Sequence, residues 1–156
     1  MSTATVPGRF ALVLHSHLPW LAHHGAWPVG EEWLHQSWAA SYMPLFAALR
    51  RLADDGHRDL LSLGMTPILA AQLDDPYCGE AMHAWLGSWR TRAHEASVVG
   101  AVEADETASA IGRREHRAAD DALADFETGW RHGASAVLRS LVDGDVVELL
   151  SGPLAH

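Results

Sequence analysis

Apolar residues form three short runs along the chain, and stretches with apolar positions at helical spacing separate them. The runs lie at 9–15, 59–65 and 145–150, and each is nearly continuous rather than alternating with polar residues. A short continuous apolar run favours a strand that is buried on both faces of a parallel sheet. We therefore predict three such strands, at 9–15, 59–65 and 145–150.

Helical spacing of apolar residues connects the predicted strands. At 31–55 apolar residues recur every three or four positions and Gly56 follows, which predicts one long amphipathic helix that bends near Pro44. Thr66 and Pro67 are typical of an N-cap and a first helical position, so we predict a helix at 67–73. The Ala-rich region beyond predicts three more helices, near 79–98, 102–128 and 133–143, with solvated mixed-charge faces.

The resulting order of elements is strand, helix, strand, helices, strand. This order is typical of a parallel α/β sheet, because helices carry the chain back between parallel strands. The 156 residues hold about three β/α units, against the roughly 250 residues of a closed barrel. We therefore interpret residues 1–156 as one domain, without a second, that forms the first part of a larger fold.

Composition and charge narrow the classes of function. With 48% hydrophobic residues the chain is typical of a globular domain, and no apolar stretch reaches the roughly 18 residues of a membrane span. Twenty acidic against eleven basic residues give a net charge of -9, the wrong sign for non-specific nucleic-acid binding. The single cysteine, Cys78, agrees with a reducing compartment. We expect a cytoplasmic protein with neither nucleic acid nor membrane as a partner.

Candidate chemistry lies where the first predicted strand ends. His15 and His17 are two residues apart, a spacing that places both on one face of a strand. In barrels the carboxyl ends of the strands carry the ligand site. Two imidazoles there bind a divalent metal ion or hydrogen-bond a polar substrate. Alternatively both are internal histidines that pin the loop, but the strand-end position and a second polar strand end at His156 favour a functional role.

An aromatic-rich loop follows the histidine pair. It contains His23, His24, Trp27 and Trp33 among glycine and proline residues. Flat aromatic rings stack on the apolar faces of sugars while neighbouring polar groups bind the hydroxyls, so this loop favours a carbohydrate ligand. Trp38, further along the predicted helix, is more typical of a core residue.

Other polar residues have structural explanations. Asp74 and Asp75 are more typical of a helix terminus or turn than of a catalytic carboxylate pair. Glu31 and Glu32 lie at the start of a predicted helix, where the helix dipole favours acidic residues. Cys78 has no basic neighbour in sequence and no nucleophile motif.

Four blocks of the sequence occur in an order typical of one family. They lie at 15–20, 24–33, 66–73 and 148–156. Together they resemble glycoside hydrolase family 57, and most closely the actinobacterial type of its 1,4-α-glucan branching enzymes. The resemblance covers essentially the whole chain and is weakest from about 95 to 130.

The resemblance implies the N-terminal part of an incomplete (β/α)7 barrel and a retaining reaction on α-glucans such as glycogen. It implies that His15 and His156 contact the sugar at the scissile bond, that His17 supports them, and that Trp27 and Trp33 line the glucan groove. The nucleophilic Glu and the acid/base Asp of the family, about 5 to 5.5 Å apart in such enzymes, match no residue within 1–156. We therefore expect a fragment that has no catalytic residue, metal or cofactor of its own and no branching activity alone.

Two other interpretations stay open. A metal-dependent hydrolase also begins with His-x-His at the end of its first strand, where the pair binds zinc or a similar ion. Bound metal after native purification would identify it. A non-catalytic glucan-binding module would keep only the sugar-contacting half of the site, and glucan retention on an affinity gel without turnover would identify that.

Overall fold

The strands of the protein form one parallel sheet. The computed structural model describes residues 8–25 and 30–154. Its strands are β1 (Val13–Ser16), β2 (Leu61–Met65) and β3 (Val147–Leu150), with β2 in the middle and both neighbours parallel to it. The predicted parallel α/β arrangement is confirmed, although all three strands begin later than predicted.

One long helical segment leads from β1 to β2, as predicted. It consists of α1 (Glu31–Ser37), a π-helical turn (Trp38–Tyr42) and α2 (Met43–Asp54). Close to the predicted bend, the N–H of Met43 donates to the carbonyl of Trp38, five residues back. Pro44 has no N–H to donate and its ring crowds the carbonyl four residues back, so a widened turn accommodates it.

The other helices follow the predicted order with different boundaries. They are α3 (Pro67–Asp74), α4 (Pro76–Val102), α5 (Glu106–Asp125) and α6 (Ala134–Asp143), with a second π-helical turn at Phe126–Trp130. The carboxylate of Asp105 caps α5 by accepting from the N–H of Ala108 at 2.9 Å. The predicted start of a helix at 102 is wrong, because α4 continues to Val102 and Ala104, with φ of 57°, makes the turn that follows.

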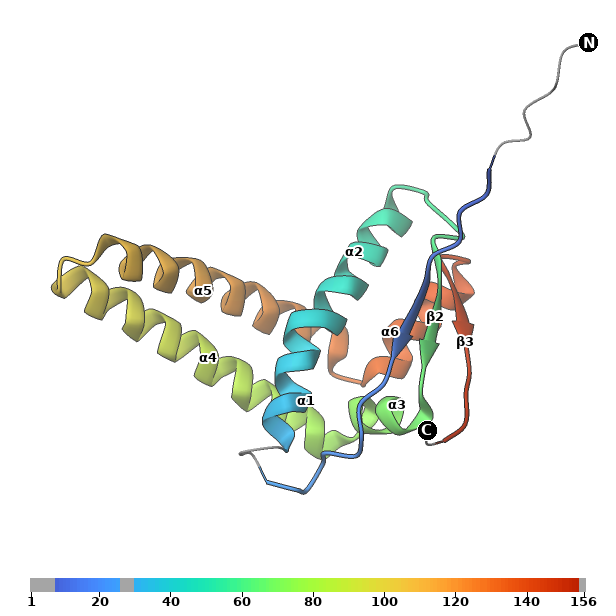
Figure 1. Ribbon diagram of the computed structural model, residues 1–156, viewed down its shortest axis with the longest axis horizontal. Helices are drawn as coiled ribbons and strands as arrows, with labels where there is room; N and C mark the ends of the chain where they lie inside the picture. The colour runs from blue at the N-terminus through green and yellow to red at the C-terminus, as the bar shows by residue number, and fades with distance from the viewer. Residues whose placement is uncertain (1–7, 26–29, 155–156) are drawn as a thin grey trace, which may run out of the picture.

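α4 and α5 form a hairpin that extends away from the sheet (Figure 1). Near its tip the two backbones lie so close that a methyl group built on Gly100 or Gly112 would be 2.5 Å from a backbone nitrogen of the opposite helix. The hydroxyl of Ser109 donates to the carbonyl of Ser97 there, at 3.0 Å. Even α4, with 27 residues, has no apolar stretch that could cross a membrane, and the same holds for the other described helices.

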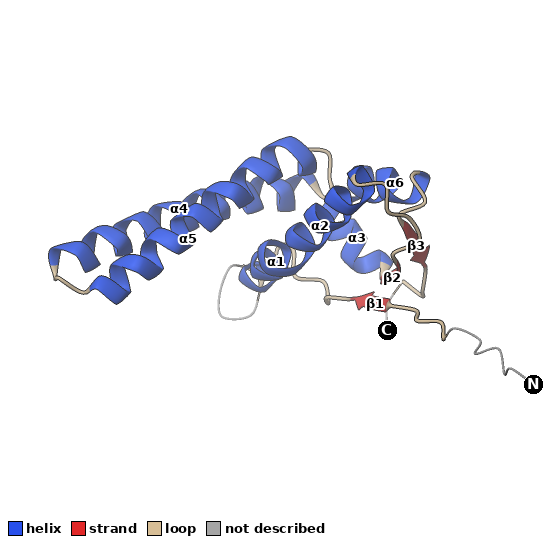
Figure 2. Ribbon diagram, turned by 90° about the horizontal axis from the view of Figure 1, so that it is seen from above, coloured by secondary structure: helices blue, strands red, loops and turns tan. Residues whose placement is uncertain are grey.

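The helices lie on one side of the sheet (Figure 2). On that side the alternate β2 side chains Leu61, Leu63 and Met65 are buried in the core. Trp38 and Trp130 pack edge to face in the same core, with ring centroids 5.6 Å apart. The prediction that Trp38 is a core residue is confirmed.

The opposite face of the sheet is open in the described part of the chain. The strand pairing places two rows of residues on it, which are Val13, Ser62 and Glu148, then His15, Gly64 and Leu150. Val13 is 60% exposed and His15 is also exposed. The prediction that β1 is buried on both faces is therefore wrong for the described residues, because the helices cover one face only. Parallel sheets are normally covered on both faces, whereas in the described residues this sheet is covered on one.

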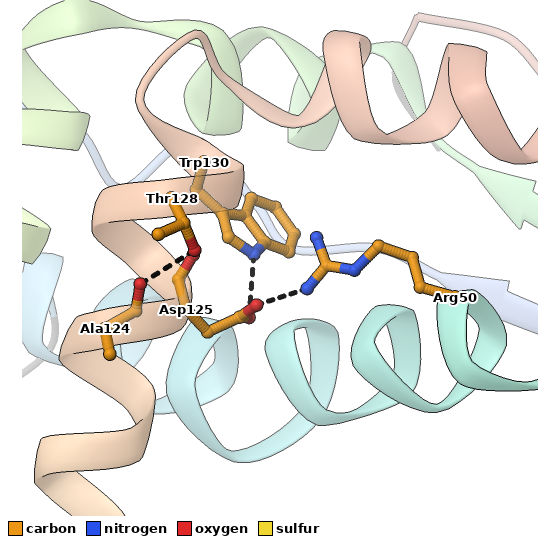
Figure 3. Close-up of polar contacts among 5 residues, drawn as sticks. All are labelled: Arg50, Ala124, Asp125, Thr128 and Trp130. Atoms are coloured by element: carbon orange, nitrogen blue, oxygen red, sulfur yellow. Dashed lines mark hydrogen bonds and ion pairs between the residues drawn. The ribbon is translucent and has the colours of Figure 1, made fainter. Parts of the chain in front are cut away.

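A half-buried ion pair joins α2 to the base of the hairpin (Figure 3). Arg50 donates to one carboxylate oxygen of Asp125, and Nε1 of Trp130 donates to the other at 3.4 Å. The side chain of Arg50 is 30% exposed and that of Asp125 is 25% exposed. The energetic contribution of a half-buried ion pair lies between those of an exposed pair and a buried pair. We therefore expect Asp125→Asn to lower the free energy of unfolding by about 1–3 kcal/mol. Denaturant unfolding measures this loss.

Asp121 provides the matched control for that substitution. It lies on the same helix and is exposed. Asp121→Asn should change the free energy of unfolding by no more than about 0.5 kcal/mol, as is usual for surface positions. Equal losses in the two variants would show that the ion pair contributes nothing specific.

Candidate functional site

His15 lies near the carboxyl end of β1, on the open face of the sheet. Its strand partner on β2 is Gly64. A methyl group built on Gly64 would lie 3.4 Å from Nδ1 of His15, so the imidazole leans over the neighbouring strand. The structure thus places an exposed imidazole where parallel α/β folds bind their ligands.

His17 is half-buried and is held by the start of α3. Its Nδ1 lies 3.1 Å from the hydroxyl oxygen of Thr66, within hydrogen-bond distance. Thr66 occupies the N-cap position of α3, but its side chain makes no capping hydrogen bond. This contact agrees with a supporting role for His17. Contact of His17 with a sugar stays a prediction.

The aromatic candidates have different positions. Trp33 lies in the first turn of α1 and is 46% exposed, so it is not a core residue. Trp20, next to the histidine pair, is also exposed. Trp27 and His156 lie outside the described residues. Their roles, and the proximity of His156 to His15, stay predictions.

Glu31 connects the loop after β1 to α4, a role that the sequence did not reveal. Its Oε1 accepts from the N–H of His23 at 2.7 Å and from the hydroxyl of Tyr77 at 2.9 Å. The hydrogen bond to this carboxylate raises the pKa of the Tyr77 phenol. The ring of His23 also stacks on Tyr77, with centroids 4.3 Å apart. The helix dipole alone therefore does not account for Glu31.

Glu148 is a second polar residue that the sequence interpretation missed. Its Oε2 accepts from the hydroxyl of Ser62 at 2.7 Å, and both side chains lie on the open face of the sheet. They occupy the row next to that of His15. A carboxylate inside an otherwise apolar strand is an uncommon pattern, and it is the signal that could have identified this residue.

The remaining candidates have structural roles, as predicted. Asp74 accepts from the N–H of Ser135 at 2.8 Å, at the start of α6, and Asp75 caps α4 by accepting from Tyr77. Burial raises the pKa of the Cys78 thiol to about 11, so it stays protonated at neutral pH. Among the described residues there is no group of three or more His, Cys, Asp or Glu side chains that could hold a metal ion.

We expect His35 to make the stability of the protein depend on pH. It is buried on α1, and burial lowers the pKa of its imidazole, while the charges of Glu31 and Glu32 act in the opposite direction. The unfolded chain binds this proton near pH 6.5 but the folded protein binds it only at lower pH, so stability is lost as the pH falls below about 6.5. We expect the Tm to fall between about pH 7.5 and pH 5.5, and to fall less in His35→Leu.

The control for this prediction is an exposed histidine. His57 lies in the turn after α2. His57→Leu should keep the pH dependence of the Tm seen in the unmodified protein. If His35→Leu kept it as well, the assignment to His35 would be wrong.

The fold and the site define a parallel α/β protein whose candidate ligand site lies at the carboxyl ends of its strands. No family model matches the chain. The chain is 54% identical over 165 residues to a probable 1,4-α-glucan branching enzyme of Mycobacterium tuberculosis, which covers 99% of this chain and 31% of the relative.

Solved structures agree with this sequence match. The branching enzyme of glycoside hydrolase family 57 from Pyrococcus horikoshii aligns with a TM-score of 0.80 and 29% identity, over 90% of this chain and 26% of that one. The corresponding enzyme from Thermococcus kodakaraensis gives 0.81 and 26% identity, over 94% and 26%. The resemblance seen in the sequence is confirmed, and the chain is related to the branching enzymes of glycoside hydrolase family 57. It spans about a third of the length of the Mycobacterium tuberculosis relative.

Proposed function

We propose that this chain supplies part of the glucan site of a 1,4-α-glucan branching enzyme. The observation that carries the proposal is the 54% identity to the Mycobacterium tuberculosis relative over 99% of this chain. The proposed partner is an α-glucan, and the proposed location is the cytoplasm. A single cysteine that is buried agrees with a reducing compartment.

The open face of the sheet forms the inside of an incomplete (β/α)7 barrel in this proposal. Parallel strands with all described helices on one side are the arrangement of barrel units, in which helices form the outer layer. The polar side chains of His15, Ser62 and Glu148 on the opposite face agree with a barrel interior that leads to a site. The residues 1–156 then form the first units of that barrel.

His15 contacts the sugar at the scissile bond in the proposed enzyme. A neutral imidazole accepts a hydrogen bond from a sugar hydroxyl, and this bond strengthens as positive charge develops on the sugar in the transition state, because the hydroxyl becomes a better donor. His17 supports His15, while His156, Trp27 and Trp33 contact or enclose the glucan. In this proposal the sugar binds at the carboxyl ends of the parallel strands, as in other barrels.

The bond-making steps need two carboxyl groups that the resemblance assigns to no residue of this chain. In a retaining reaction a carboxylate attacks the anomeric carbon and displaces the leaving sugar, which takes a proton from the acid. A hydroxyl group of an acceptor glucan then displaces the carboxylate and gives its proton to the same acid/base group. This chain contributes substrate binding to those steps.

A hybrid protein tests the proposal. Residues 1–156 replace the matching 31% of the Mycobacterium tuberculosis relative, and the hybrid is incubated with linear amylose. We expect α-1,6 branches, measured as short chains released by a debranching enzyme. Release of reducing sugars without new branches would contradict the proposal.

Two further measurements on the same protein address the alternatives. Stoichiometric zinc in a natively purified hybrid that forms no branches would favour a metal-dependent hydrolase. Retention on a glucan gel without any turnover would favour a binding module.

A further inference from the structure

Gln72 is a fully buried polar side chain that holds the loop after β1. It lies on α3 and none of its surface is exposed. Its Oε1 accepts from the N–H groups of Leu21 and Ala22, at 2.6 and 3.2 Å. Its Nε2 donates to the carbonyls of Pro19 and Ile68, at 2.9 and 3.2 Å.

These four bonds use the full hydrogen-bonding capacity of the amide. A glutamine side chain has two acceptor sites and two donor hydrogens, and here two N–H groups meet the oxygen and two carbonyls meet the nitrogen. The partners therefore fix which way the amide faces. Three of the four belong to the segment 19–22, which has no strand or helix to satisfy its backbone. Gln72 takes the place of a secondary-structure partner for that segment.

The same helix also holds the other end of the loop segment. Thr66, just before α3, contacts the imidazole of His17, and Gln72, near the end of α3, binds the backbone at 19–22. The short segment 17–22 is thus attached to α3 at both ends. His15 differs, because the strand pairing of β1 with β2 holds its backbone.

We propose that Gln72 is a positioning residue of the glucan site and that it acts through His17. By fixing the segment 19–22 it keeps the His17 imidazole against Thr66, and so keeps the loop in register with His15 at the end of β1. This inference rests on the proposed branching function. In this inference Gln72 touches no substrate itself, and it positions the residues that are proposed to bind the substrate.

The test uses two variants of Gln72 in the hybrid protein. Gln72→Met keeps the length of the side chain and removes all four hydrogen bonds, whereas Gln72→Glu keeps an acceptor for Leu21 and Ala22. We expect the branching rate per folded molecule to fall at least about tenfold in Gln72→Met and to be partly restored in Gln72→Glu. Amides of the segment 17–25 should exchange with deuterium at least about tenfold faster in Gln72→Met.

A core variant separates positioning from lost stability. Val137 is buried on α6 and makes none of the hydrogen bonds that hold the segment 17–22. Val137→Ala should lower the Tm but leave the rate per folded molecule within about twofold and the exchange of 17–25 unchanged. A loss of rate in Val137→Ala equal to that in Gln72→Met would assign a structural role only and overturn the proposal.

The same substitution in a His17→Ala protein tests whether Gln72 acts through His17. If Gln72 acts through His17, Gln72→Met should lower the rate much less in a His17→Ala protein than in the unmodified hybrid, because the two effects are then not additive. Full additivity, or unchanged exchange of 17–25 in Gln72→Met, would overturn the proposal. A hybrid that forms no branches would refute the proposed function instead, and the exchange measurement would still decide whether Gln72 holds the loop.

Discussion

Replacing His15 with alanine in the hybrid protein is expected to lower the branching rate by roughly thirty- to a thousandfold. The imidazole lies on the open face of the sheet, over Gly64 and near the end of β1. A hydrogen bond that strengthens in the transition state affects the rate directly, and its loss costs on the order of 2 to 4 kcal/mol. Initial rates per folded molecule measure the effect, since each 1.4 kcal/mol is about a factor of ten.

His15→Ala should change the Tm little, because the side chain is exposed. His57→Ala is the matched control, since His57 is exposed and lies before β2, at the opposite end of the sheet from His15. It should keep the full rate. A histidine that only pins the loop would give the reverse pattern for His15, a clear fall in Tm with nearly intact kinetics. Rates within a factor of about three of the unmodified hybrid would remove His15 from the site.

The order of strands and helices could be predicted from the sequence because it depends on local signals. Continuous apolar runs marked the three strands, and the Thr66–Pro67 pair marked the start of α3 where the structure has it. The exposed face of β1 could not be predicted. An apolar run does not reveal whether neighbouring elements cover one face of a strand or both. Val13 is apolar, as a residue buried on both sides would be, and yet it is 60% exposed.

The two π-helical turns show a finer limit of the sequence interpretation. Pro44 indicated a bend in the helix 31–55, and the structure has a π turn at Trp38–Tyr42, just before that residue. The second π turn coincides with Thr128, whose hydroxyl donates to the carbonyl of Ala124 at 2.8 Å (Figure 3). Such a bond competes with the backbone ladder of the helix. A threonine inside a helix is common, so it predicted no turn at that position.

The sequence pointed only to those residues of the candidate site that are proposed to touch a ligand. His15 and His17 form a motif at a predicted strand end, and in the structure His15 lies near the carboxyl end of β1. Gln72 and Glu31 form no motif with the loop. Gln72 accepts from the backbone of Leu21, 51 residues away, and Glu31 accepts from the N–H of His23 and the hydroxyl of Tyr77. Contacts between a side chain and a distant backbone leave no periodic signal in the sequence. Supporting residues of this kind become visible only once the chain has folded.

Gly100 and Gly112 are expected to be essential for the hairpin of α4 and α5. A methyl group on Gly100 would lie 2.5 Å from the backbone nitrogen of Ser109, and one on Gly112 would lie 2.5 Å from that of Ser97. Backbone cannot move aside as a flexible side chain does, so each alanine forces the helices apart at about 1–3 kcal/mol. The double variant should therefore lose about 2–6 kcal/mol of the free energy that protects the hairpin, if the two costs add.

Gly87 provides the control that separates the effect of close helix packing from the effect of glycine on helix stability. It lies on the same helix α4, and a methyl group built on it meets nothing within 4 Å. Alanine is the better helix former by roughly 0.5–1 kcal/mol, so Gly87→Ala should slow amide exchange in the hairpin while Gly100→Ala and Gly112→Ala accelerate it. Hydrogen exchange of hairpin peptides measures all three variants in one experiment. If all three shifted exchange in the same direction, helix propensity rather than contact between the two backbones would govern the hairpin.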